Sequence, residues 1–98
     1  MASNTIEIVR FKLKDGVDLK TFITQNKYVE QNLVSKMPGF VSRETAQSAD
    51  GEWAVILHWQ GPEDAQNSMN KFVAAPEAKE FTALIDMDTF SMTRYAQI

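Results

Sequence analysis

The chain has 98 residues with 44% hydrophobic and 23% charged residues, which is typical of one globular domain covering residues 1–98. It contains no cysteine, which excludes disulfides, thiolate metal sites and cysteine nucleophiles. The net charge of −3 and the lack of a basic stripe argue against a nucleic-acid binder. No apolar run approaches the roughly 20 residues that span a bilayer, and residues 1–5 do not resemble a signal peptide. We therefore expect a cytoplasmic protein that does not bind membranes.

The first half of the chain predicts a strand, a long helix and a second strand. Thr5–Leu13 alternates as a strand does, and residues 19–36 then change to helical spacing after an Asp18 cap. The motif Met37-Pro38-Gly39 ends the helix, and Phe40–Gln47 is a more polar strand, which indicates an edge position. The inward face of the predicted helix comprises Leu19, Phe22, Ile23, Asn26, Val29 (or Glu30) and Leu33.

The second half predicts a hairpin, a second helix and a last strand. Asp50-Gly51 is a hairpin turn before the apolar strand Glu52–Gln60. Gly61-Pro62 opens a helix that Ala75-Pro76 interrupts, and a strand from about Asp88 to Ala96 closes the chain. The inward stripe of this second helix comprises Ala65, Met69, Phe72 and Val73, and its short continuation adds Phe81, Leu84 and Ile85.

The element order β-α-β-β-α-β predicts an α+β, ferredoxin-like fold. Right-handed crossovers then give a four-stranded antiparallel sheet with both helices on one face. The strands carry apolar residues on both faces, for example Ile6 and Ile8 opposite Val9 and Phe11, so the face without helices needs a cover. We expect a homodimer that packs sheet against sheet, and the alternative is a monomer with an unusually apolar open sheet.

The residues also resemble a known family. The strand Ile6–Leu13, the helix stop Pro38-Gly39-Phe40, the strand end His58-Trp59, and the run Ala75–Ala78 leading to Phe81 resemble the dimeric α/β-barrel superfamily, in particular its antibiotic-biosynthesis-monooxygenase-like group. The resemblance covers nearly the whole chain. It implies a dimeric barrel with one pocket per subunit between the sheet and its helices, and a cofactor-independent oxidation. The His and Trp of haem-degrading members and the His-Pro-x-His of cyclase-like members have no match here.

Two polar residues are candidates for catalysis. His58, the one histidine, could accept a phenolic proton near neutral pH, or it could be an inert, partly buried strand residue. Asn26 lies on an otherwise apolar helix face, where an unpaired amide costs about 1–3 kcal/mol. It could bind a substrate oxygen, or it could bond to a backbone group or to water.

Six aromatic residues could line a pocket for a planar ligand, or could simply be core. Arg10 and Arg94 could hold an anionic substrate, or could face a dimer rim or pair with Glu7 or Asp88. No spacing of His and carboxylates indicates a metal site, and we expect no cofactor. The six aromatic candidates are Phe22, Trp53, Trp59, Phe72, Phe81 and Tyr95.

Two functions remain open at this point. The first is a cofactor-independent monooxygenase that oxidises a small planar phenolic or quinol-type metabolite. The second is a barrel protein without catalysis that binds a small hydrophobic molecule or acts in a stress response. Both predict a small apolar or aromatic ligand, so the position and lining of a cavity become the decisive structural question.

Overall fold

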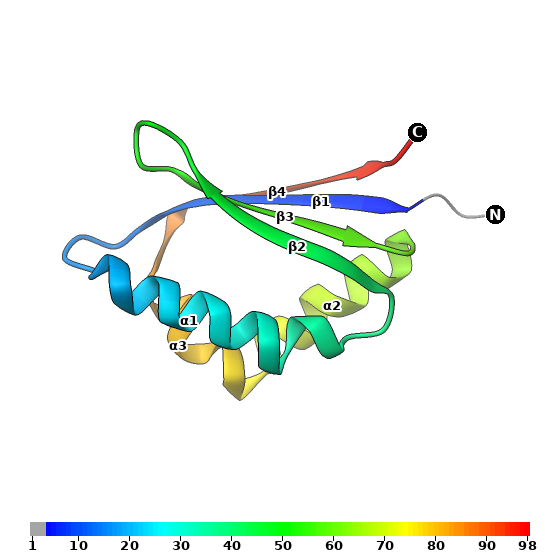
Figure 1. Ribbon diagram of the computed structural model, residues 1–98, viewed down its shortest axis with the longest axis horizontal. Helices are drawn as coiled ribbons and strands as arrows, with labels where there is room; N and C mark the ends of the chain where they lie inside the picture. The colour runs from blue at the N-terminus through cyan, green and yellow to red at the C-terminus, as the bar shows by residue number, and fades with distance from the viewer. Residues whose placement is uncertain (1–3) are drawn as a thin grey trace.

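The computed structural model describes residues 4–98, which form one antiparallel sheet with every helix on the same side of it (Figure 1). The strand order is β2-β3-β1-β4, and the predicted ferredoxin-like fold is confirmed. The two central strands, β1 and β3, are the most apolar ones, as expected for strands with a neighbour on each side. The elements are β1 (Thr5–Leu13), α1 (Leu19–Asn32), η1 (Val34–Lys36), β2 (Phe40–Gln47), β3 (Trp53–Trp59), α2 (Pro62–Ala74), η2 (Pro76–Ala78), α3 (Lys79–Ala83) and β4 (Ile85–Ala96).

Several boundaries follow the local signals in the sequence. The Asp18 carboxylate accepts a hydrogen bond from the Thr21 amide at 3.3 Å and caps α1. The long first helix ends earlier than expected, at Asn32, and a short 3₁₀ turn follows it. The break at Ala75-Pro76 is confirmed, and β2 is the edge strand that its polarity indicated.

Strand register gives the two faces of the sheet different environments. Glu7, Val9 and Phe11 of β1 point toward the helices and are buried. On this inner face, Glu7 lies between Leu57 and Arg94 of the neighbouring strands. The outer face carries Ile6, Ile8 and Arg10 of β1, together with Ala54, Ile56 and His58 of β3 and Ser91, Thr93 and Tyr95 of β4.

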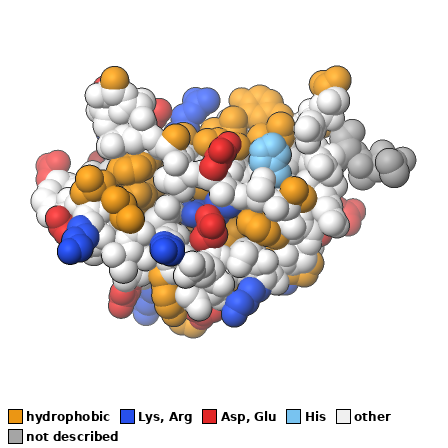
Figure 2. Space-filling model, in the orientation of Figure 1, with side chains coloured by type: hydrophobic (Ala, Val, Ile, Leu, Met, Phe, Trp, Pro, Cys, Tyr) orange, Lys and Arg blue, Asp and Glu red, His pale blue; other side chains and the backbone are white. Residues whose placement is uncertain are grey.

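The outer face of the sheet stays partly open in one copy of the chain. Its central pair, Ile8 and Ile56, is only half-buried, and Tyr95 is exposed. Hydrophobic side chains are visible along the upper edge of the molecule, where the sheet lies (Figure 2). The sequence expectation of two apolar sheet faces therefore describes the structure correctly.

Two irregularities in the sheet shape the inner face. The β2–β3 register shifts between Phe40 and Ser42, so Phe40 and Arg43 both face inward. The β1–β4 register shifts between Arg10 and Lys12, where the partners jump from Ser91 to Asp86. Residues 87–90 therefore bulge out of the ladder. The last strand begins at Ile85 rather than near Asp88, because Ile85 and Asp86 pair with Leu13 and Lys12 of β1 ahead of the bulge.

Helix α1 uses a narrower face than expected. Phe22 and Val29, two turns apart, are its buried residues, whereas Leu19 and Ile23 are about half exposed. The predicted inward position of Leu19 and Ile23 is wrong. The space beside α1 is occupied by α3, where Gln25 donates a hydrogen bond to Glu80 at 2.9 Å. The helix therefore presents Phe22, Asn26 and Val29 to the sheet, which is a narrower stripe than the spacing predicted.

The turn at Gly39 yields a stability prediction. Gly39 has a φ of +80°, and an added Cβ would lie 2.2 Å from the Asp64 carboxyl carbon. Gly16 has a similar φ of +81° with no atom within 4 Å, so it serves as a matched control. We expect Gly16→Ala to lose about 1–2 kcal/mol of unfolding free energy from backbone strain alone. Gly39→Ala should lose at least about 1 kcal/mol more, and equal losses in urea denaturation would contradict the predicted clash.

Candidate functional site

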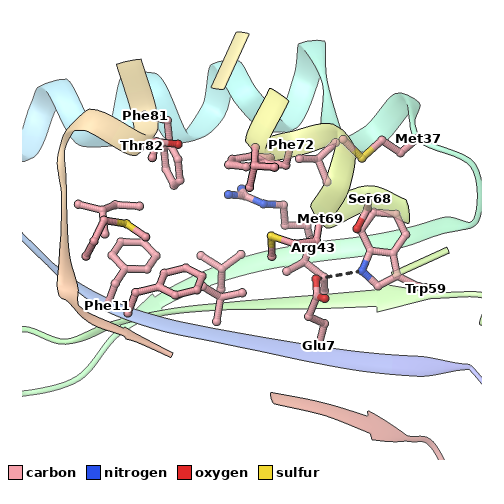
Figure 3. Close-up of a pocket in the computed structure, with 18 residues that line it drawn as sticks. Glu7, Phe11, Met37, Arg43, Trp59, Ser68, Met69, Phe72, Phe81 and Thr82 are labelled. Carbon is pink, nitrogen blue, oxygen red and sulfur yellow. Dashed lines mark hydrogen bonds between the residues drawn. The ribbon is translucent and has the colours of Figure 1, made fainter. Parts of the chain in front are cut away.

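A cavity of about 180 Å³ lies between the inner face of the sheet and the helices (Figure 3). All four strands, α2, α3 and the segment after α1 contribute to its wall. The wall is almost entirely apolar, which is the usual form of a small-molecule site. The lining residues are Glu7, Val9, Phe11, Val34, Met37, Arg43, Val55, Leu57, Trp59, Ser68, Met69, Phe72, Val73, Phe81, Thr82, Ile85, Met87 and Phe90.

The mouth of the cavity lies between α2 and the bulge in β4. Val73 near the end of α2 and Met87 in the bulge both line the cavity, yet they are 75% and 54% exposed. The bulge is held by Thr89, whose hydroxyl accepts from the Lys12 amide at 2.8 Å and donates to the Asp86 carbonyl at 2.7 Å. These two exposed side chains mark the side of the cavity that is nearest to solvent.

Glu7 places a carboxylate in the apolar wall. Its side chain is only 3% exposed, and its Oε2 accepts from Arg94 Nε at 2.7 Å. The other oxygen, Oε1, accepts from Trp59 Nε1 at 3.4 Å, and Figure 3 shows this contact beside the cavity. A carboxylate has about four acceptor positions. These two bonds therefore leave acceptor capacity for a ligand.

Arg43 places the opposite charge in the same wall. Its side chain is 3% exposed, and it reaches the cavity from the edge strand β2. Arg43 Nη1 donates to Glu30 Oε1 at 3.2 Å, and Nη2 donates to Asn26 Oδ1 at 2.7 Å. The Asn26 amide in turn donates to Thr45 Oγ1 at 3.1 Å. Burial lowers the pKa of Arg43 below its ordinary value, and Glu30 offsets part of this effect.

The predicted aromatic residues divide into two groups on the inner face. Trp59, Phe72 and Phe81 line the cavity. Phe22 and Trp53 do not line it but support it from behind: their rings lie 4.6 Å apart, and Phe22 packs on Phe81 with ring centroids 5.7 Å apart. The structure thus brings five of the six predicted aromatic residues to the helix side of the sheet.

The remaining predicted residues lie elsewhere. His58 and Tyr95 are on the outer face of the sheet, where both pair with Ile6, so the sheet separates them from the cavity. Asn26 is near the cavity but contacts Arg43 and Thr45, and it is not part of the lining. Arg94 pairs with Glu7, one of the alternatives considered, whereas Arg10 is on the opposite face.

Sequence reasoning did not select Glu7 or Arg43 as site residues. Glu7 had a visible signal, because it shares the alternating face of Val9 and Phe11 and so predicts a buried carboxylate. Arg43 had no such signal in the sequence, because a simple alternation of side chains along the strand from Phe40 directs Arg43 outward. Only the bulge around Val41 turns it toward the helices.

Residues 4–98 contain no group of three or more His, Cys, Asp or Glu side chains placed to hold a metal ion. Within the same residues, no helix is long and apolar enough to cross a membrane.

Solved structures of the same fold include oxygenases. SnoaB from Streptomyces nogalater, a cofactor-independent oxygenase, matches with a TM-score of 0.79 at 16% identity over 99% of this chain and 95% of its own. A candidate antibiotic biosynthesis monooxygenase from Chloroflexus aurantiacus matches with a TM-score of 0.69 at 17% identity over 98% and 94%. A dimeric protein of unknown function with a ferredoxin-like fold from Bacteroides fragilis matches with a TM-score of 0.65 at 17% identity over 96% of both chains.

Sequence comparison adds no closer relative, since neither protein-family models nor curated protein sequences gave a significant match. At these identities the structural likeness establishes the fold alone. The fold of the antibiotic-biosynthesis-monooxygenase-like group, which the sequence motifs suggested, is therefore confirmed.

Proposed function

We propose that the chain is a cofactor-independent monooxygenase that oxidises a small planar phenolic or quinol-type molecule in the cavity. The observation that carries the proposal is an apolar, aromatic-lined cavity with a buried carboxylate and a buried guanidinium in its wall. The likeness to a cofactor-independent oxygenase supports the same reaction type. An engineered cavity of 150 Å³ accepts benzene. The slightly larger cavity here suits a molecule of one or two rings.

The reaction needs no reductant other than the substrate. A quinol and O₂ give a hydroxyquinone and water: one oxygen atom bonds to a ring carbon, and the other leaves with two hydrogens. The quinol supplies all the electrons. Removing its phenolic proton makes the ring electron-rich enough to react with O₂, and a positioned base typically contributes about 10²–10⁴ in rate.

Glu7 is the acceptor placed to take this proton, because it faces the cavity. A general base must come within hydrogen-bond reach of the proton that it removes. His58 meets this condition only for a ligand on the outer face. A catalytic role for His58 stays a prediction that requires the ligand to bind on the outer face. Substituting Glu7 and His58 in turn distinguishes the two candidate bases.

Oxygen uptake with 1,4-naphthoquinol tests the proposed reaction. Spontaneous oxidation converts O₂ to hydrogen peroxide, from which catalase returns half of the oxygen, whereas the enzymatic reaction ends in water. We expect catalase-insensitive uptake and a hydroxyquinone product. Glu7→Gln should lower the rate by about 10²–10⁴, and His58→Ala should leave it unchanged. Uptake that is fully catalase-sensitive would refute the oxygenase, and loss of uptake in His58→Ala alone would move the reaction to the outer face.

A steric block tests whether the cavity is the site of this reaction. Val73→Trp puts a large ring at the mouth without crowding the core, because Val73 is mostly exposed. Asn67→Trp is the matched control on α2, since Asn67 is exposed and does not line the cavity. We expect kcat/KM to fall about tenfold or more in V73W, a loss of about 1.4 kcal/mol in transition-state binding. Equal activity in both variants would contradict the assignment.

The proposed assembly is a homodimer that packs the outer faces of two sheets together. Its support is the half-buried pair Ile8 and Ile56 and the dimeric protein of the same fold. Ile56→Glu puts a charge at the centre of this face. We expect a 22 kDa particle, twice 11.1 kDa, for the unaltered protein and a single-chain mass for I56E in sedimentation at micromolar concentration. A single-chain mass for both would refute the dimer.

A binding protein without catalysis is the second candidate function. It is favoured by the absence, in residues 4–98, of a match to the catalytic motifs of haem-degrading or cyclase-like relatives. It predicts that aromatic ligands bind in the cavity and that no catalase-insensitive oxygen uptake occurs.

A further inference from the structure

We propose that Arg43 is the anchor for an anionic oxygen, so that the cavity selects planar aromatic molecules that carry a carboxylate or an ionised hydroxyl. This inference rests on the proposed cavity site and adds its specificity. It is independent of whether the ligand is then oxidised.

The donor inventory of Arg43 supports the proposal. A guanidinium has five N–H donors. Its hydrogen bonds within the described residues use Nη1 toward Glu30 and Nη2 toward Asn26, which leaves Nε–H and further N–H groups without a protein acceptor. The side chain is 3% exposed and lines a wall that is otherwise mostly apolar. An anionic oxygen in the cavity would satisfy these donors with a charge-assisted bond, which is about twice as strong as a neutral one.

The charge balance around the cavity favours an anion over a cation. Glu7 is compensated by Arg94 at 2.7 Å and by the Trp59 indole N–H. Within residues 4–98, the charge of Arg43 is compensated by Glu30, at the longer distance of 3.2 Å and with a side chain that is 40% exposed and therefore screened by water, and its second hydrogen bond goes to the neutral Asn26 amide oxygen. The less compensated charge in the wall is the positive one.

Asn26 is then a positioning residue for Arg43. Its amide oxygen accepts from Nη2 at 2.7 Å, and its amide nitrogen is fixed by Thr45. This chain of hydrogen bonds from Thr45 through Asn26 to Arg43 holds the guanidinium plane in one orientation. The polar residue that the sequence marked on an apolar helix face thus acts through Arg43 rather than on the ligand itself.

Binding of three matched probes tests the proposal: 2-naphthoate, the neutral and nearly isosteric 2-naphthamide, and 2-naphthylmethylammonium. Isothermal titration calorimetry gives each Kd. We expect the carboxylate to bind about tenfold tighter than the amide, which corresponds to about 1.4 kcal/mol, and the cation to bind most weakly. In Arg43→Met the preference for the carboxylate should vanish while the amide keeps its Kd.

Two further variants keep the test decisive if Arg43→Met does not fold. Asn26→Ala should reduce the carboxylate preference and leave amide binding unchanged, and Asn26→Asp, whose negative charge compensates Arg43, should reduce the carboxylate preference at least as much. Loss of affinity for all three probes together would indicate a merely structural role for Asn26. Equal affinity for carboxylate and amide in the unaltered protein, or tighter binding of the cation, would overturn the anion site. Ligand binding in the cavity would still be supported. No binding of any probe would overturn both.

Discussion

Replacing Arg94 by methionine should destabilise the protein by about 3–5 kcal/mol, because it leaves Glu7 as an unpaired charge in an apolar wall. Glu7 is 3% exposed, and Arg94 Nε is its charged partner at 2.7 Å. Burial of a carboxylate without its cation costs far more than the loss of an exposed ion pair. Urea denaturation gives the change in unfolding free energy.

Two comparisons show whether this loss comes from the buried charge. Glu7→Gln combined with Arg94→Met should recover most of the stability, because the remaining amide is neutral and can still accept from the Trp59 indole. Lys27→Met removes an exposed charge from α1 and should change stability by less than about 0.5 kcal/mol. An Arg94→Met variant as stable as K27M would mean that Glu7 is not held by this pair.

Phe22→Ala should cost about 3–5 kcal/mol, while its neighbour Ile23→Ala should change the unfolding free energy by less than about 1 kcal/mol. Phe22 is fully buried and packs on Trp53, Phe81 and Phe11. Ile23 is 52% exposed, and alanine is the better helix former at an open position.

Because Phe22 and Ile23 are adjacent in the sequence, comparing their two variants tests how α1 is rotated about its own axis relative to the sheet. Both side chains were expected to face inward from their spacing, and only the structure separates them. Similar losses for the two variants in urea denaturation would show that α1 is rotated so that Ile23 shares the core. In that case the positions of Phe22 and Trp53 behind the cavity would be wrong.

The elements and the two faces of the central strands could be predicted from the sequence because each rests on local signals. Alternation identified the inward face of β1, Pro38-Gly39 marked the helix stop, and Ala75-Pro76 marked the interruption after α2. The fold then follows from the element order and the handedness of its crossovers. The sequence left open whether its six candidate aromatic residues line a pocket or belong to the core, and Trp59, Phe72 and Phe81 line the cavity.

The polar part of the site depends on features that alternation does not contain. One extra residue near Val41 reverses the direction of every later side chain in β2, and this brings Arg43 inward and makes Asn26 its partner. The bulge at residues 87–90 forms the mouth, and it comes from a shift of register between β1 and β4 that alternation does not reveal. His58 drew attention as the one histidine, but residue type does not determine which sheet face a strand residue occupies.

The most direct test of the central claim is to observe where an aromatic ligand binds. With methyl-labelled protein and 2-naphthoate, nuclear Overhauser effects report which methyl groups lie within contact distance of the ring. The account predicts contacts to Met69 and Val55, which line the cavity on its helix and sheet sides. Contacts confined to Ile8 and Ile56 on the outer face would contradict it.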